Sequence, residues 1–161
     1  MNIKERLQKT IESGETLGAD FRYKDLSDME FEDCSLKGID FRGANLSNCT
    51  FRKCNLSLCL FDGANLEGAT FAKVRGENVQ IREANFTGAS FEDTYFCYSE
   101  FHRSKFAGCY FLRTGIEESD ISGASFSAER MGIDFRECNG YATIKTLGKK
   151  DHSGTIGTTI L

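Results

Sequence analysis

The sequence predicts an all-β fold, a four-sided β-solenoid, because three regularities run through most of the chain. A large apolar residue returns at every fifth position between Ala19 and Ile133, and a small residue precedes most of these by two positions. Residues twenty positions apart also tend to match, so that Phe follows Phe and Leu follows Leu. A period of five fits neither the helical repeat of about 3.6 nor the strand repeat of about two. It fits a coil that turns a corner every five residues and closes a square in about twenty.

An amphipathic helix is expected before the coil. Ile3, Leu7 and Ile11 stand four positions apart with charged residues between them, and Gly14 follows as a stop signal. An open solenoid end exposes unpaired backbone groups and apolar rings, so it needs a cover. We therefore expect residues 3–12 to form a helix that caps the N-terminal end. The alternative is a docking helix for a partner.

Several blocks of the repeat share one pattern. Each begins with Ala, continues with Asn or Ser and has Leu or Phe at its centre: 44–48 (ANLSN), 64–68 (ANLEG), 84–88 (ANFTG) and 89–93 (ASFED). These blocks resemble the consensus of the pentapeptide-repeat proteins, Ala-(Asp/Asn)-(Leu/Phe)-X-X, and the resemblance covers the whole periodic stretch. It implies the right-handed quadrilateral β-helix. It implies no single activity, because the family includes proteins that act on DNA gyrase, cyanobacterial regulators and secreted effectors.

Gly76 alone breaks the series of large residues. The bulkier Val74 and Val79 occupy the neighbouring small positions and would fill part of the space, and the period resumes in phase at Ile81. We therefore expect this coil to stay in register. The alternative is a local bulge over residues 73–80.

The register slips by one residue after Met131. Residues 133–136 (IDFR) repeat residues 39–42, although they fall one position out of phase with the preceding period. The repeat predicts a displaced last coil that ends at Cys138 or Gly140.

Three parts of the chain follow from these patterns. Residues 1–18 are expected to form the capping helix and its exit, residues 19–140 the solenoid, and residues 141–161 a C-terminal cap or flexible tail. Three structures stay open for the tail: a short strand over the C-terminal end, strand pairing between two molecules of a homodimer, and disorder of residues 150–161.

Composition restricts the class of protein. The 161 residues suit one domain, and a net charge of −4 with a pI near 5.3 argues against direct binding to nucleic acid, which requires a basic surface. No apolar run is long enough to span a membrane, and residues 1–14 are charged where a secretory signal would be apolar. We expect a cytoplasmic protein that has no membrane contact and no cofactor.

The seven cysteines raise the question of disulfide bonds. Five of them occupy the small inward position, which predicts buried free thiols: Cys34, Cys49, Cys54, Cys59 and Cys109. Cys34 and Cys54 are expected to stack on adjacent coils, so a bridge between them is the alternative to two free thiols. Cys97 falls in an outward position, where its thiol is able to react. The inward cysteines lack the paired spacing and the histidine partner of a zinc site, so no metal is expected.

An enzyme is not expected. The chain has two histidines and no glycine-rich phosphate loop, and an interior filled by its own side chains leaves no cavity for a substrate. His102 stacks over Arg82 and is interpreted as a surface residue. The outer sides remain, and they suit a rigid module that binds a protein partner.

One cluster of outward residues is unusual for such a surface. Aromatic and apolar side chains gather around one corner, the last two on the neighbouring side of the next coil: Tyr95, Cys97, Tyr98, Tyr110 and Leu112. Exposed aromatic side chains are typical of contact surfaces, so these five residues are the candidate partner surface. The alternative interpretation is that tyrosine is well tolerated on any β surface.

A second function follows from the family resemblance. Quinolone-resistance members act on DNA gyrase and are thought to resemble duplex DNA, which requires rows of acidic residues. One column of this chain is acidic at four of its positions: Asp20, Asp40, Glu100 and Asp120. Leu60 and Gln80 interrupt that column, and arginines lie beside it. A DNA-mimicking modulator of gyrase or topoisomerase is therefore the alternative to a scaffold with another partner.

Overall fold

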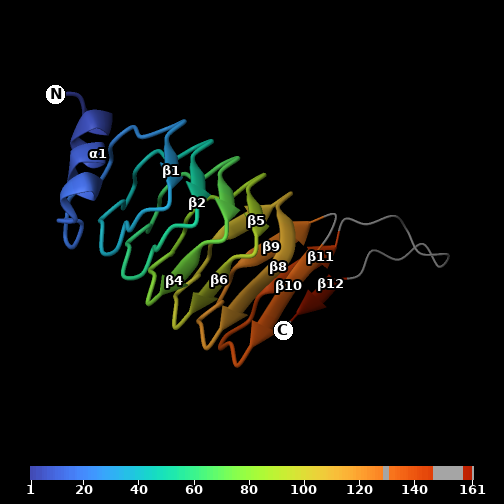
Figure 1. The fold of residues 1–161 in the computed structure, drawn as a ribbon. Helices are drawn as coiled ribbons and strands as arrows, with labels where there is room; N and C mark the ends of the chain where they lie inside the picture. The colour runs from blue at the N-terminus through green and yellow to red at the C-terminus, as the bar shows by residue number, and fades with distance from the viewer. Residues whose placement is uncertain (129–130, 147–157, 161) are drawn as a thin grey trace.

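The structure is a computed structural model that describes residues 1–128, 131–146 and 158–160. One helix is followed by a stack of short, mostly parallel strands that wind around a common axis (Figure 1). The elements are α1 (Ile3–Ser13), β1 (Glu30–Glu32), β2 (Thr50–Arg52), β3 (Thr70–Ala72), β4 (Arg75–Glu77), β5 (Ser90–Glu92), β6 (Tyr95–Cys97), β7 (Lys105–Ala107), β8 (Tyr110–Glu117), β9 (Ser125–Ala128), β10 (Met131–Arg136), β11 (Thr143–Thr146) and β12 (Thr158–Ile160). No helix in these described ranges is long and apolar enough to cross a membrane.

Each coil contributes one extended segment to each of four sides, and we name each side after one inward residue. The Phe31 side contains β1, β2, β3, β5 and the first half of β8, and the Gly76 side contains β4, β6 and the second half of β8. The Leu46 side contains β7, β9 and β11, whereas the Phe41 side is joined by isolated parallel bridges. The predicted four-sided, all-β solenoid is therefore confirmed.

Stacked rings and aliphatic side chains fill the interior. Phe51 lies opposite Phe71 in the register, and their ring centroids are 4.9 Å apart, close to the usual strand spacing of about 4.8 Å. Phe91 continues the stack, with its ring centroid 4.8 Å from that of Phe71. All three side chains are buried. Removal of this apolar surface from water stabilises the solenoid.

The small inward positions accept cysteine, serine and threonine because most of these polar groups find a backbone partner. The Cys49 thiol donates to the carbonyl oxygen of Leu26 in the preceding coil at 3.1 Å, and the Thr94 hydroxyl donates to that of Phe71 at 3.2 Å. Cys34 and Cys54 are both free thiols, and their Sγ atoms lie 3.5 Å apart. Cys34 is only partly buried, unlike the other four inward cysteines.

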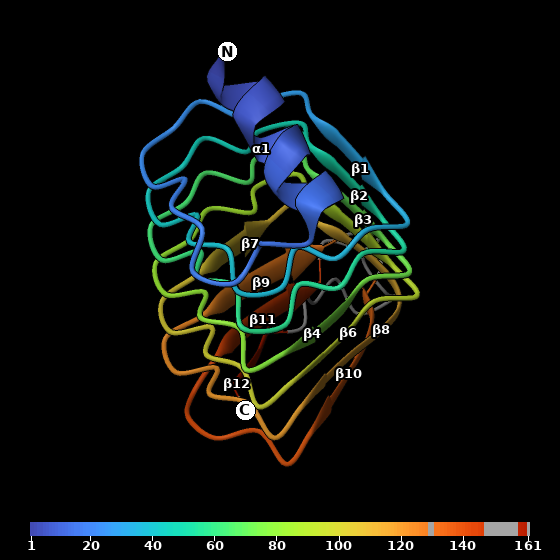
Figure 2. The same ribbon diagram turned by 60° about the vertical axis from the view of Figure 1, so that its left-hand side comes forward.

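Helix α1 lies across the first coil (Figure 2). It begins with a capping box between Asn2 and Glu5 and ends at Gly14, whose φ of 74° is the left-handed conformation that glycine adopts easily. Leu7 is fully buried, and its neighbours on the same helix face pack against the core. The Arg6 guanidinium lies 4.9 Å from the ring centroid of Phe21. The predicted N-terminal helix is confirmed, and its apolar face covers the open end.

The coil around Gly76 stays in register, as predicted. Gly76 lies opposite Phe96, and the flanking residues pair without a bulge. A Cβ added to Gly76 would lie 2.6 Å from Cδ1 of Phe96 and 2.8 Å from Cγ2 of Val79. The Phe96 ring and Val79 therefore occupy the space that a side chain at residue 76 would need.

The register shift after Met131 is present. Met131 lies opposite Phe111 but Ile133 lies opposite Thr114, so the last coil is one residue shorter than the coil before it. Phe135 therefore lies opposite Ile116 on the Gly76 side, rather than on the side of its sequence counterpart Phe41.

The ladder continues beyond the last coil. β11 pairs in parallel with β9, and β12 pairs antiparallel with β11 at the C-terminal end (Figure 1). The prediction of disorder for residues 150–161 lies outside the described residues, except at 158–160.

Candidate functional site

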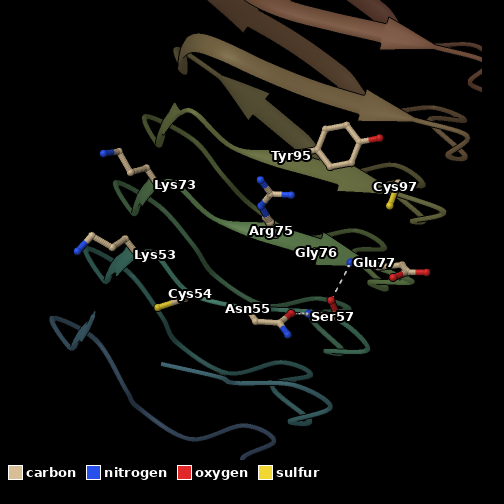
Figure 3. A pocket seen from close by; sticks show the side chains of 10 residues that line it. All are labelled: Lys53, Cys54, Asn55, Ser57, Lys73, Arg75, Gly76, Glu77, Tyr95 and Cys97. Atoms are coloured by element: carbon tan, nitrogen blue, oxygen red, sulfur yellow. Dashed lines mark hydrogen bonds between the residues drawn. The ribbon is translucent and has the colours of Figure 1, made fainter. Parts of the chain in front are cut away.

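The Gly76 side carries a shallow hollow with a volume of about 440 Å³ (Figure 3). Residues from three successive coils line it: Lys53, Cys54, Asn55, Ser57, Lys73, Arg75, Gly76, Glu77, Tyr95 and Cys97.

Unequal side-chain lengths in two outward columns produce this hollow. Asn55 lies opposite Arg75, and Arg75 lies opposite Tyr95, so one short side chain is followed by two long ones in this column. Ser57 is a short side chain in the next column, beneath Glu77. The short side chains of Asn55 and Ser57 leave room that the longer side chains border (Figure 3).

Tyr95 is fixed in place at the edge of the hollow. Its hydroxyl donates a hydrogen bond to Oε2 of Glu117 in the following coil. Its ring lies over Gly115, where an added Cβ would come within 2.8 Å of Cδ2 of the ring. The hydrogen bond with Glu117, together with desolvation, raises the pKa of Tyr95 to about 12. Tyr95 therefore presents a neutral ring in a defined orientation.

Cys97 and Tyr98 follow after the buried Phe96, and we call Tyr95, Cys97 and Tyr98 the Tyr95 cluster. Tyr98 stands at the next corner with a φ of 51° and is 50% exposed, and its hydroxyl donates to Oε1 of Glu118 at 2.9 Å. Cys97 is partly buried and lines the hollow. Burial, and then the nearby carboxylates, of which Glu77 is the strongest, raise the pKa of its thiol. Cys97 is thus a weak nucleophile at neutral pH.

The other two residues of the predicted partner surface lie on the neighbouring side, where the count of five put them. Tyr110 and Leu112 are in β8 on the Phe31 side. An ion pair between Arg113 and Asp93, with Nη2 and Oδ2 3.0 Å apart, occupies the corner that separates them from the hollow. The structure therefore brings the Tyr95 cluster together and places Tyr110 and Leu112 on the adjacent side.

Three cations border the hollow although the chain as a whole is acidic. The Lys53 Nζ pairs with Oδ2 of Asp33 at 3.1 Å. Within the described part of the chain, neither Lys73 nor Arg75 has a carboxylate at ion-pair distance. Sequence reasoning did not select these three cations as site residues. The sequence does contain a signal for them, because residues twenty positions apart share a column. Lys73 follows Lys53 in one column, and Arg75 follows the shorter Asn55 in another.

The family to which the chain belongs follows from its sequence. A family model described as a pentapeptide repeat region matches residues 24–100. The chain is a pentapeptide-repeat protein. Its fold is accordingly the right-handed quadrilateral β-helix that the resemblance implied. Among curated proteins, none matches this sequence.

Several solved structures resemble this pentapeptide-repeat protein. One is a pentapeptide repeat protein (Rfr23) from the cyanobacterium Cyanothece 51142, with 14% identity, a TM-score of 0.41, and coverage of 86% of this chain and 95% of that one. Another is a trypsin-treated variant of QnrB1, a plasmid-mediated fluoroquinolone resistance protein. It has 18% identity and a TM-score of 0.42, and the match covers 74% of this chain and 76% of that one. A third is a pentapeptide repeat protein from the thylakoid lumen of Arabidopsis thaliana. It has 20% identity and a TM-score of 0.32, and the match covers 82% of this chain and 72% of that one. None of these likenesses extends to a function.

The acidic column of this pentapeptide-repeat protein lies on the Phe41 side, and arginines neutralise much of it. Arg42 Nη2 lies 2.7 Å from Oδ2 of Asp40, and Arg22 Nη2 lies 2.8 Å from Oδ2 of Asp20. Higher in the column, Arg82 pairs with Glu100. The side is therefore a row of ion pairs rather than a continuous negative surface.

Metal binding has no visible site in the described ranges. No three His, Cys, Asp or Glu side chains of those ranges are placed to hold an ion together.

Proposed function

We propose that this pentapeptide-repeat protein is a rigid, non-enzymatic scaffold that binds a protein partner through the Tyr95 cluster on its Gly76 side. One observation carries the proposal: two exposed or partly exposed tyrosines, Tyr95 and Tyr98, are each hydrogen-bonded to a glutamate of the next coil, beside a hollow. Tyrosines fixed in this way lose little conformational freedom on binding, which favours affinity.

The interior supports the absence of catalysis. The packing leaves an interior void of about 10 Å³, lined only by apolar side chains such as Leu56, Phe61 and Phe96. A void of this size and polarity holds no substrate and scarcely a water molecule. We therefore place the activity on the outer surface.

A photo-crosslinking experiment in cells of the source organism tests the proposal. A photoreactive amino acid at residue 78 would stand in the corner column directly before Tyr98, on an exposed position. The matched control carries the same group at residue 67, an exposed position on the Leu46 side. We expect a defined covalent adduct from residue 78 and none from residue 67.

The tyrosines are then tested in the residue 78 background. The double substitution Y95S/Y98S should abolish the adduct, whereas Y110S on the Phe31 side should leave it unchanged. Adducts that persist in Y95S/Y98S, or that form equally from residue 67, would rule out the Tyr95 cluster as the contact surface.

We do not extend the proposal to DNA gyrase. Mimicry of duplex DNA requires unpaired acidic groups, and the acidic column on the Phe41 side is largely paired with arginine, as at Asp40 and Arg42. A gyrase supercoiling assay with a fluoroquinolone decides between the two functions. We expect neither protection nor inhibition, and either effect at micromolar protein would favour the gyrase function instead.

A further inference from the structure

We propose that the hollow on the Gly76 side is a binding site for a phosphate-type dianion, which Arg75 binds directly and to which Lys53 and Lys73 at the border add positive charge. This site goes beyond the proposed scaffold function, because it needs no protein partner and can be tested on the isolated chain.

Lys73 is the unpaired member of a charged corner column. In that column Asp33 pairs with Lys53. The carboxylate of Asp93 accepts hydrogen bonds from both Nε and Nη2 of Arg113. Lys73 stands between these two pairs, and the carboxylate of Asp93, whose pKa its charge helps to lower, is already engaged by Arg113. Its side chain lines the hollow, but its ammonium end points away from Arg75 (Figure 3), so this exposed side chain has to turn toward the guanidinium to bind the same anion.

Arg75 is unpaired for a different reason. Its neighbours along the column, Asn55 and Tyr95, carry no charge, and the Tyr95 hydroxyl already donates to Glu117. The guanidinium lies at the hollow between Lys73 and Tyr95 (Figure 3). Its planar fork of donors matches two oxygens of a phosphate or carboxylate group.

The floor of the hollow offers donors rather than acceptors. The Oδ1 of Asn55 accepts from the Ser57 N–H at 2.9 Å, so the Asn55 amide nitrogen is left to donate. The Oγ of Ser57 accepts from the Glu77 N–H at 3.2 Å, so its hydroxyl proton is available as well. A neutral or cationic ligand would find few acceptors on this floor, whereas an oxyanion finds donors.

The local charge selects a dianion. Three cations and one carboxylate, Glu77, line the hollow, on a chain whose net charge is −4. The hollow is shallow and larger than one phosphate group, so a phosphate esterified to a larger molecule also fits. The shared chemistry is therefore a phosphate monoester or inorganic phosphate.

An NMR titration of the ¹⁵N-labelled full chain tests this site. The ionic strength is kept constant, because added salt screens charge interactions. The probes are inorganic phosphate, a phosphoserine peptide and the same peptide without its phosphate. We expect saturable shifts of the backbone amides of Asn55, Ser57, Arg75 and Glu77. The variant K73Q/R75Q should weaken binding at least about tenfold. The control K105Q, an exposed lysine on the Leu46 side, should bind as wild type.

The probes also distinguish the source of the phosphate. Tighter binding of the phosphopeptide than of inorganic phosphate indicates an esterified phosphate on a protein, and equal or weaker binding indicates a small phosphate ligand. Shifts scattered over all lysines, an equal loss in K105Q, or no saturation with either phosphate probe would overturn the proposal. Failure of the crosslinking experiment at residue 78 would leave this result unaffected.

Discussion

The ring of Phe96 fills the space beside Gly76, the one exception in the series of large inward residues. A Cβ at residue 76 would approach Cδ1 of that ring to 2.6 Å. The glycine is therefore matched to its neighbour in the next coil, and is not a defect that a larger residue would repair.

Gly76→Leu should accordingly destabilise the protein, although it restores the repeat pattern. Overpacking a filled core costs about 1–3 kcal/mol, and the loss is measured as the free energy of unfolding in urea. The second substitution F96L removes the obstructing ring, so the double variant G76L/F96L should lose less than the sum of the two single variants. Additive losses would show that Phe96 and residue 76 do not compete for one space.

Phe91→Ala should remove about 3–5 kcal/mol from the free energy of unfolding, because it leaves a cavity in the middle of a ring stack. Phe91 lies between Phe71 and Phe111, with ring centroids 4.8 and 5.1 Å away. The milder Phe91→Leu keeps most of the volume and should cost clearly less, since the Leu46 side shows that leucine fits this interior. An F91A variant as stable as F91L would contradict the filled-tube architecture.

The sequence predicted the inward and outward residues well because every coil repeats the same backbone path. One count of five therefore placed residues as distant as Phe31 and Phe111 on one column, and kept Gly76 in register. The side on which Phe135 lies was harder to predict from the sequence. The last coil is one residue shorter than the coil before it, and this shift places Phe135 over Ile116.

The candidate site was predicted only in part. Tyr95 and Tyr98 are outward by the same count, which also places Tyr110 on the neighbouring side of the next coil. The ion pair of Arg113 and Asp93 at the corner between them was not predicted. The hollow depends on the relative lengths of Asn55, Arg75 and their neighbours across three coils, and on which cations stay unpaired. Those are properties of side-chain packing, which a count along the chain does not contain.

The buried cysteines should be unreactive in the folded protein. Burial raises the pKa of the Cys49 thiol to about 11, and those of Cys59 and Cys109 to about 12, so almost no thiolate exists at pH 8. A short pulse of iodoacetamide followed by mass spectrometry should label the partly buried Cys97 before these three. In urea all seven cysteines should be labelled. Labelling of Cys59 as fast as Cys97 in the native protein would contradict its burial.

Acid should destabilise the protein in part through Asp40. Burial raises the pKa of this carboxyl, but the hydrogen bonds from Arg42 and the charges of Arg42 and Arg22 outweigh burial and hold the pKa below its usual range. The folded state therefore favours the ionised carboxylate. Its contribution is present above the unfolded pKa of about 3.9 and is lost as the pH falls through the lower folded value.

Asp40→Asn should thus lower the free energy of unfolding at neutral pH. Below about pH 5 the free energy of unfolding of this variant should fall less steeply with pH than that of wild type. Urea unfolding at several pH values and low ionic strength measures both effects, because salt screens such pairs. Glu67→Gln serves as the control, since Glu67 is exposed and has no ion pair among the described residues. The ion pairs of the Phe41 side would not contribute to acid sensitivity if D40N followed the same pH dependence as wild type and E67Q.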